Sequence, residues 1–159
     1  MPVSLSQADV RCGAKAANLG ALLGAGFTVP NGVVILPDEK WDDGWLDGLG
    51  SGPFVVRSSS HAEDSARLSF AGQFLSVLGV ESSAVGDAVR RVAGSGRAPG
   101  VRAYAARHGV QAEETIPVLV QDQICAEVAG AIVSGRVDPE RWVIDGEAAP
   151  QRAGSRPTY

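Results

Sequence analysis

The sequence predicts an α+β fold, a mixed or antiparallel sheet with helices on one side. Three segments carry apolar residues at helical spacing, and three strand-like segments follow one another near the end of the chain. Strands that succeed each other directly favour antiparallel pairing. With 159 residues, 45% of them hydrophobic, the chain can bury one ordinary core. Residues 1–159 are therefore expected to form a single domain.

The first helix is expected over Gly13–Leu23, in the segment GAKAANLGALL. Alanine and leucine favour helix, and the apolar residues recur at helical spacing. A proline, asparagine and glycine at 30–32 then predict a turn that leads into a strand over Val33–Leu36. The following residues, 37–52, contain several acids and glycines and are interpreted mainly as a connector.

A second strand, Pro53–Arg57, runs into a dense polar segment, SSSHAEDSARLSFAGQ. The segment Phe74–Val80 is predicted to return as the next strand, as in a hairpin. Ser83 is expected to cap a helix that buries its valines and exposes Arg90 and Arg91.

A third helix is predicted to begin at Pro99 and stop at Gly109, because proline suits a first helical turn. His108 is expected to be a helix-end residue rather than a ligand.

The tail GEAAPQRAGSRPTY, residues 146–159, is expected to be mobile because of its composition. The three remaining strands are expected at residues 116–124, 129–137 and 141–147.

Composition excludes several classes of function. A net charge of -4 and a pI of about 5.1 argue against a broad nucleic-acid-binding face. The sequence has no apolar run of about 18 residues and no secretory-type start, so we expect a cytoplasmic protein without a membrane partner. Cys12 and Cys125 lack metal-ligand spacing and are expected to be reduced, buried thiols.

The polar segment after the second strand allows two interpretations. Arg57 followed by Ser58, Ser59 and Ser60 offers a planar cation with hydroxyl and backbone donors, a combination that suits phosphate oxygens. Alternatively, Arg57 pairs with Glu63 or Asp64, and the serines cap a turn. Two glycine-containing segments, GAKAANLG and SFAGQ, could approach phosphates, but neither matches the phosphate-binding glycine pattern of a dinucleotide fold or a P-loop. Residue chemistry alone does not choose between the two.

Three segments follow one another in the same order as the motifs of one protein family: GAKAANLGALLGAGFTVPNGVVIL, VRSSSHAEDSARLSFAGQ and VLVQDQICAEVAGAIVSGRVDP. They resemble motifs of the ATP-binding domain of the phosphoenolpyruvate synthase and pyruvate phosphate dikinase family, which includes rifampin phosphotransferase. The family's patterns are a GGKGANL-like helix start with a VPxGFVIT-like strand, VRSSATAED with SFAGQ, and a VQRMV-like strand with AGVxFTxDP. The resemblance implies an ATP-grasp-like domain.

The resemblance also implies roles for individual residues. Lys15 and Arg57 would contact ATP phosphates and stabilise the charge that shifts during transfer. Gly72 would let the backbone approach the phosphates, with the Ser76 hydroxyl nearby. Gln121 would lie near the adenine or ribose. Taken alone, Lys15 would be interpreted as a solvated helix residue.

The resemblance implies a magnesium ion held by an acidic residue at the end of the strand that follows the VDP turn. Asp145, with Glu147 close behind, occupies that place in WVIDGE. Hard oxygen ligands suit magnesium, which bridges phosphates. Aspartate stands where the family has glutamate, Gln151 is only a candidate further ligand, and a charged strand end at the surface is the alternative interpretation.

The chain departs from the family in two ways. The connector before the VRSS motif is much shorter, and no swivelling phosphohistidine domain fits in this length; neither His61 nor His108 stands in such a motif.

Two functions therefore remain. The chain is a Mg-ATP-dependent phosphotransferase module of the kinase or dikinase type, which phosphorylates a separate phosphohistidine-domain partner or a small acceptor. Alternatively, it is a non-catalytic nucleotide-binding or interaction protein of the same fold.

Overall fold

The computed structural model describes residues 1–37, 39–41, 43–61, 64–65, 68–69, 74–109, 114–134 and 142–148. Its helices are α1 (Gly13–Gly24), α2 (Val85–Ala93) and α3 (Pro99–Arg107), with short 3-10 helices η1 (Leu5–Gln7), η2 (Val10–Cys12), η3 (Asp43–Gly48), η4 (Ser82–Ala84) and η5 (Gly94–Arg97). Its strands are β1 (Val3–Ser4), β2 (Gly32–Ile35), β3 (Phe54–Ser58), β4 (Asp64–Ser65), β5 (Leu68–Ser69), β6 (Ser76–Val80), β7 (Val118–Asp122), β8 (Val128–Ser134) and β9 (Trp142–Ala148).

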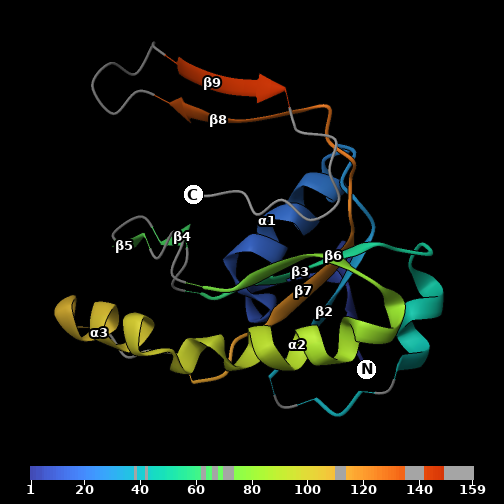
Figure 1. Ribbon diagram of the computed structural model, residues 1–159, viewed down its shortest axis with the longest axis horizontal. Helices are drawn as coiled ribbons and strands as arrows, with labels where there is room; N and C mark the ends of the chain where they lie inside the picture. Colours follow the sequence, from blue (N-terminus) through green and yellow to red (C-terminus); the bar gives the residue numbers. More distant parts are fainter. Residues whose placement is uncertain are drawn as a thin grey trace. The chain divides into compact units, whose positions relative to one another are not determined.

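The chain divides into two compact units, Met1–Gln123 and Ile124–Tyr159. Within the first unit, five of the described strands form one sheet in the order β1-β2-β7-β3-β6 (Figure 1). All of its neighbouring strands pair antiparallel. The hairpin return expected after the polar segment is confirmed, since β6 pairs with β3.

The sheet of the first unit is covered by helices on both faces, so the prediction that helices lie on one side is wrong. Apolar side chains of α2 pack with Val118 and Val120 of β7, whereas those of α1 pack with Leu119. Successive residues of a strand point to opposite faces, so α1 and α2 lie on opposite sides (Figure 1). The physical reason is that β7 is apolar at every position from Val118 to Val120 and must be buried on both faces.

Three predicted helices are confirmed with small changes at their ends. α1 extends one residue past Leu23, and α3 begins at Pro99 as expected, with His108 as its C-cap. The valines of α2 are buried and Arg90 and Arg91 are exposed. The predicted cap is wrong: Ser83 lies in η4, and α2 begins after Ala84 without a side-chain cap.

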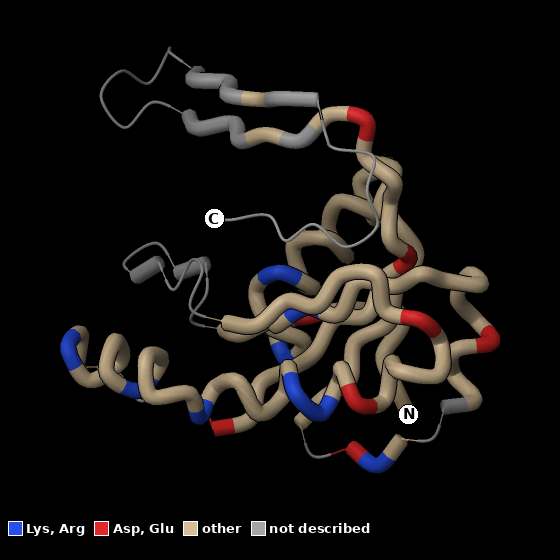
Figure 2. The backbone as a smooth tube through the Cα atoms, viewed as in Figure 1, with Lys and Arg blue, Asp and Glu red and all other residues tan. Residues whose placement is uncertain are grey.

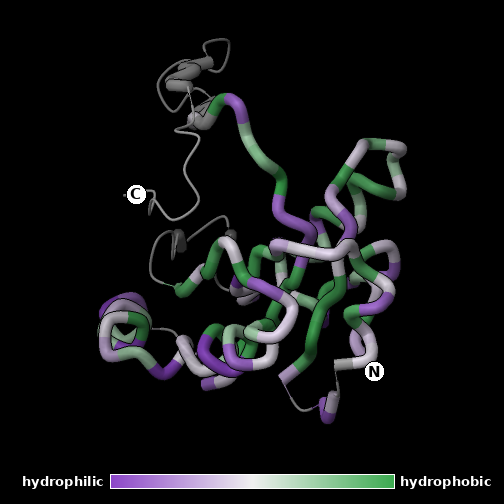
Figure 3. The backbone as a smooth tube through the Cα atoms, turned by 45° about the vertical axis from the view of Figure 1, so that its right-hand side comes forward, coloured by the Kyte–Doolittle hydropathy of each residue, from purple (hydrophilic) through white to green (hydrophobic). Residues whose placement is uncertain are grey.

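Hydrophobic residues concentrate in the strands of this sheet and on the helix sides that face it (Figure 3). The α2-side core contains Phe54 and Val56 of β3 with α2, and the α1-side core contains Cys12, Ala16 and Val34. Each core is closed by residues of the first unit. The sheet therefore has a packed core on each face, and both cores lie within the first unit.

The described part of the second unit is a hairpin of β8 and β9, paired antiparallel. The prediction of three successive strands is confirmed, but β7 belongs to the sheet of the first unit. Residues 146–148, expected in the tail, belong to β9. The rest of the predicted mobile tail, 149–159, lies outside the described residues.

The two cysteines differ in exposure. Both are free, as expected, but only Cys12 is buried, whereas Cys125 is exposed. The prediction for Cys125 is wrong because this residue follows the end of β7 and takes no part in either core. Among the described residues, none of the helices is long and apolar enough to cross a membrane.

Candidate functional site

The start of α1 is held against the end of β3 by two close contacts. Gly13 has a φ of 80°, and a Cβ built on it would lie 1.4 Å from the backbone oxygen of Ser59. One turn later, the Ala16 amide donates a 3.0 Å hydrogen bond to the Ser59 hydroxyl. Only glycine allows both this backbone angle and this approach. The contact fixes where the first turn of α1 meets the strand.

The segment before α1 is also ordered by local hydrogen bonds. The Asp9 side chain accepts from the Arg11 backbone amide at 2.9 Å and caps η2. Hydrogen bonding to the Arg11 guanidinium lowers the pKa of the exposed Asp9 carboxyl and raises that of Arg11. These groups order the short helix that leads into α1.

Lys15 projects from α1 to the end of β3. Its ammonium group donates a 3.0 Å hydrogen bond to the backbone oxygen of Ser58, and the side chain is half-buried. The solvated-helix interpretation of Lys15 therefore does not describe its position. The bond places a positive charge one residue beyond Arg57 in β3.

Arg57 and Ser76 lie directly opposite each other on β3 and β6. Their neighbours Val56 and Val77 pack in the α2-side core, so Arg57 and Ser76 face the α1 side. On its other flank Arg57 is paired in register with Leu119 of the α1-side core. Within the described residues, no hydrogen bond or ion pair engages the Arg57 guanidinium. A cation and an exposed hydroxyl thus share one face of the sheet with Lys15.

The serines after Arg57 are buried in the fold, whereas the phosphate-binding interpretation expected them to offer hydroxyl groups to a ligand. Ser58, Ser59 and Ser60 are each wholly buried. The Ser59 amide donates to the Pro117 oxygen at 2.9 Å, and its hydroxyl accepts from α1. Ser59 therefore ties α1 to the strands, a role different from the turn capping of the alternative interpretation.

Gln121 lies on the α1 side of β7, paired in register with Val55 of β3. Its side chain is 3% exposed, and its amide nitrogen donates a 3.0 Å hydrogen bond to the Pro30 oxygen. The position is about 7 Å along the strand from the level of Arg57. Its hydrogen bond holds the segment before β2, so this amide already has a structural partner.

The remaining predicted site residues belong to other parts of the chain. Gly72 lies outside the described residues. Asp145 and Glu147 are positions of β9 that pair with Ala131 and Ala129 of β8. Two positions that are two residues apart in a strand fall on the same face. Within the described residues, no group of three or more histidines, cysteines and acids is placed to hold a metal ion.

Sequence reasoning missed Gly13 and Ser59 as positioning residues. Helices most often begin with serine, threonine or aspartate at the cap, yet this helix has Cys12 as its N-cap and begins with Gly13. A glycine in that place was the available signal for a close backbone approach. The partner, Ser59, could be identified only from the tertiary contact, because it is 46 residues away in sequence.

Comparison with known proteins gives one family. The family described as "Pyruvate phosphate dikinase, AMP/ATP-binding domain" matches residues 46–149, about two thirds of the chain. The matched stretch contains Arg57, Ser76, Gln121 and both β9 acids but begins after Lys15. No curated protein matches the sequence.

Proposed function

Because the chain belongs to the pyruvate phosphate dikinase AMP/ATP-binding domain family, which has an ATP-grasp-type α+β fold, we propose that it binds Mg-ATP on the α1 side of its main sheet. Membership implies ATP binding in a kinase- or dikinase-type enzyme. The finer proposal is a phosphotransferase module that passes a phosphoryl group to a separate phosphohistidine-domain protein or a small acceptor. Its cytoplasmic location stays a prediction.

The observation that carries the proposal is the convergence of two cations at one end of β3. Lys15 reaches the Ser58 oxygen from α1, and Arg57 faces the same side from the preceding strand position. A guanidinium without a partner among the described residues is available to bind phosphate oxygens in a planar, bidentate manner. These residues fit the triphosphate of ATP.

Phosphoryl transfer depends chiefly on positioning and on stabilising charge. Arg57 and Lys15 would bind the phosphates and stabilise negative charge as it moves toward the leaving group. Ser76, exposed and opposite Arg57, would donate its hydroxyl to a phosphate oxygen. Gly72 keeps its proposed role of close backbone approach.

Asp145 and Glu147 would hold the magnesium ion, which supplies charge neutralisation between phosphates when bound. Asp145 and Glu147 are alternate positions of β9, and magnesium takes one or two carboxylates and otherwise binds phosphates and water. Gln121 is proposed to lie near the base or ribose. Its side-chain nitrogen donates to the Pro30 oxygen, and its side-chain oxygen would be the atom that contacts the nucleotide.

A second function, nucleotide binding without catalysis, is favoured because Lys15 and Gln121 already make hydrogen bonds within the fold. Lys15 and Gln121 both donate to backbone oxygens within the fold. A domain in which these contacts persist would bind nucleotide without turnover, as a non-catalytic nucleotide-binding or interaction protein. The two functions share ATP binding and differ in phosphoryl transfer.

Phosphoryl transfer tests the choice between them. The protein is incubated with magnesium, ATP labelled at either the β- or the γ-phosphate, and lysate from its native source, and the label is followed to any acceptor. The enzyme proposal expects a labelled acceptor, lost in Asp145→Asn while ATP binding persists. Intact ATP binding with no transfer under any supplementation supports the non-catalytic function instead.

A further inference from the structure

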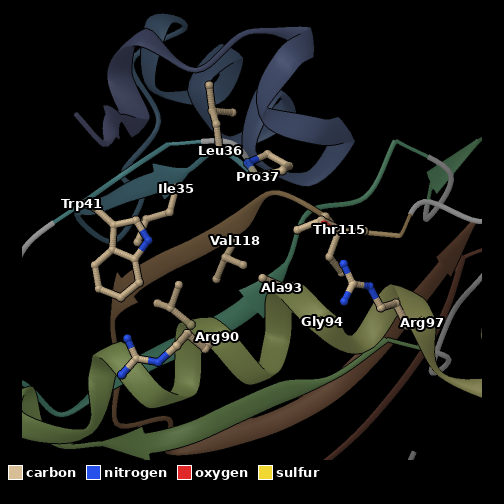
Figure 4. Close-up of a pocket in the computed structure, with 12 residues that line it drawn as sticks. Ile35, Leu36, Pro37, Trp41, Arg90, Ala93, Gly94, Arg97, Thr115 and Val118 are labelled. Atoms are coloured by element: carbon tan, nitrogen blue, oxygen red, sulfur yellow. The ribbon is translucent and has the colours of Figure 1, made fainter.

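A pocket of about 260 Å³ lies on the α2 side of the main sheet (Figure 4). Its floor includes Ile35 of β2 and Val118 of β7, which belong to the α2-side core. Their chain neighbours Val34 and Leu119 belong to the α1-side core. The pocket is therefore on the opposite face of the sheet from Lys15 and Arg57, and the proposed ATP site does not use it.

The size and lining of this pocket limit its occupant. Pockets for drug-sized ligands commonly measure roughly 300–1,000 Å³, so the occupant here is smaller. Ile35 and Val118 make the floor apolar, and the indole of Trp41 forms one wall (Figure 4). Flat apolar groups pack well against an indole ring. These surfaces select a compact ligand with an apolar, planar body.

The two arginines of the pocket are in different electrostatic states. Arg90 donates to Asp87 at 2.7 Å, and its guanidinium carbon lies 5.8 Å from the centroid of the Trp41 ring. Its charge is therefore already compensated. Among the described residues, no hydrogen bond or ion pair engages Arg97, which lies beside Thr115 at the other end of the pocket (Figure 4).

Basic positions recur along α2, η5 and α3 (Figure 2), but Arg90 and Arg97 are the ones that line this pocket. They are seven residues apart, roughly 10 Å along a helical axis. A guanidinium beside a hydroxyl is suited to a carboxylate, which accepts two parallel N–H bonds. The polar end of the pocket is thus the Arg97 end.

We propose that this pocket binds a small aromatic monocarboxylate, such as a bicyclic aryl acid. The ring system would lie against Trp41 and the apolar floor, and the carboxylate would bind Arg97 with Thr115 as a further donor. The apolar body supplies burial, and the single charge fixes the orientation of the ligand. This site is separate from the proposed ATP site, because it is on the other face of the sheet.

The test uses the full chain and two matched probes, 2-naphthoate and its neutral counterpart 2-naphthalenemethanol. Binding is measured by calorimetry and located by amide shifts of residues around Ala93 and Thr115 in NMR spectra. The variants are Arg97→Gln and, as a matched control, Arg91→Gln, an exposed arginine of α2 that does not line the pocket. Ala93→Leu, at the pocket wall, blocks the space without removing a charge.

The proposal expects 2-naphthoate to bind and to shift the pocket amides. Arg97→Gln should weaken its binding about tenfold or more, because a charge-assisted hydrogen bond is lost, and Ala93→Leu should abolish it. Arg91→Gln should leave it unchanged, and the alcohol should bind at least tenfold more weakly. The proposal is overturned if the acid does not bind, if the alcohol binds as well, or if both arginine variants behave alike.

Discussion

At the scale of single residues, the contact between Gly13 and Ser59 determines where Lys15 stands. A side chain at position 13 would adopt an unfavourable positive φ and would place its Cβ 1.4 Å from a backbone oxygen. Backbone atoms cannot move aside as a flexible side chain can. The position of the candidate phosphate-binding lysine therefore depends on a residue that has no side chain of its own.

Gly13→Ala is expected to lower the free energy of unfolding by about 3 kcal/mol or to prevent folding, since backbone strain alone costs about 1–3 kcal/mol. Gly24→Ala is the matched control at the other end of α1, where no atom lies within 4 Å of the added Cβ. It should change stability by less than about 1 kcal/mol. Urea denaturation measures both, and similar losses in the two variants would contradict the proposed contact.

The two thiols are expected to react at different rates. Burial raises the pKa of the Cys12 thiol, whereas Cys125 is exposed. A thiol reagent such as DTNB should modify one cysteine per native chain quickly and the second only in denaturant, and Cys125→Ser should remove the fast reaction. Loss of the fast reaction in Cys12→Ser would refute this assignment.

The raised Cys12 pKa also gives a direction to the pH dependence. Unfolded thiols ionise near pH 8.5, and the unfolded chain releases this proton more readily than the folded chain. The contribution of Cys12 to stability is therefore complete below about pH 8.5 and falls as the pH rises above it. Cys12→Ala should remove that part of the decline.

At the scale of elements, α2 is the most clearly amphipathic of the α-helices in the described residues. Its buried side packs on β3, β6 and β7, and Val89 is 2% exposed in that core. Val89→Ala should lower the free energy of unfolding by about 2 kcal/mol through lost burial and the cavity that remains. Arg91→Ala, on the exposed side, should stay within about 0.5 kcal/mol. Equal effects in denaturant titrations would mean that α2 does not pack as described.

Most elements could be predicted because their signals are local. Helical spacing identified α1 and α2, and apolar runs identified β3, β6 and β7. The placement of helices on both faces could not be read from these patterns, because a fully apolar strand such as β7 does not show which partner covers each side. The cap was missed for a local reason: η4 takes up Ser83 before α2 begins.

Sequence motifs could predict the residues of the candidate site but not their contacts. The motifs gave Lys15, Arg57 and Ser76 as candidate residues, and the register shows that Ser76 lies opposite Arg57. The structural roles of Ser59 and the Gln121 amide arise from tertiary contacts with Ala16 and Pro30, which no spacing in the sequence indicates.

At the scale of the whole molecule, the predicted site residues are divided between the two units. Lys15, Arg57, Ser76 and Gln121 belong to Met1–Gln123, and Asp145 and Glu147 belong to Ile124–Tyr159. The first group carries the proposed contacts to ATP, and the second carries the proposed contacts to magnesium. Substitutions of the first group should therefore affect nucleotide affinity, and substitutions of the second group should affect transfer more than affinity.

Calorimetric titration of Mg-ATP into the wild type, Arg57→Ala and Arg91→Ala tests whether ATP binds on the α1 side of the main sheet. Both arginines lie in the first unit, but only Arg57 faces the α1 side beside Lys15. Binding on that side predicts that Arg57→Ala weakens ATP binding about tenfold or more, as expected for loss of a charge-assisted hydrogen bond, while Arg91→Ala binds as the wild type does. Equal losses in the two variants, or an unchanged affinity in Arg57→Ala, would contradict it.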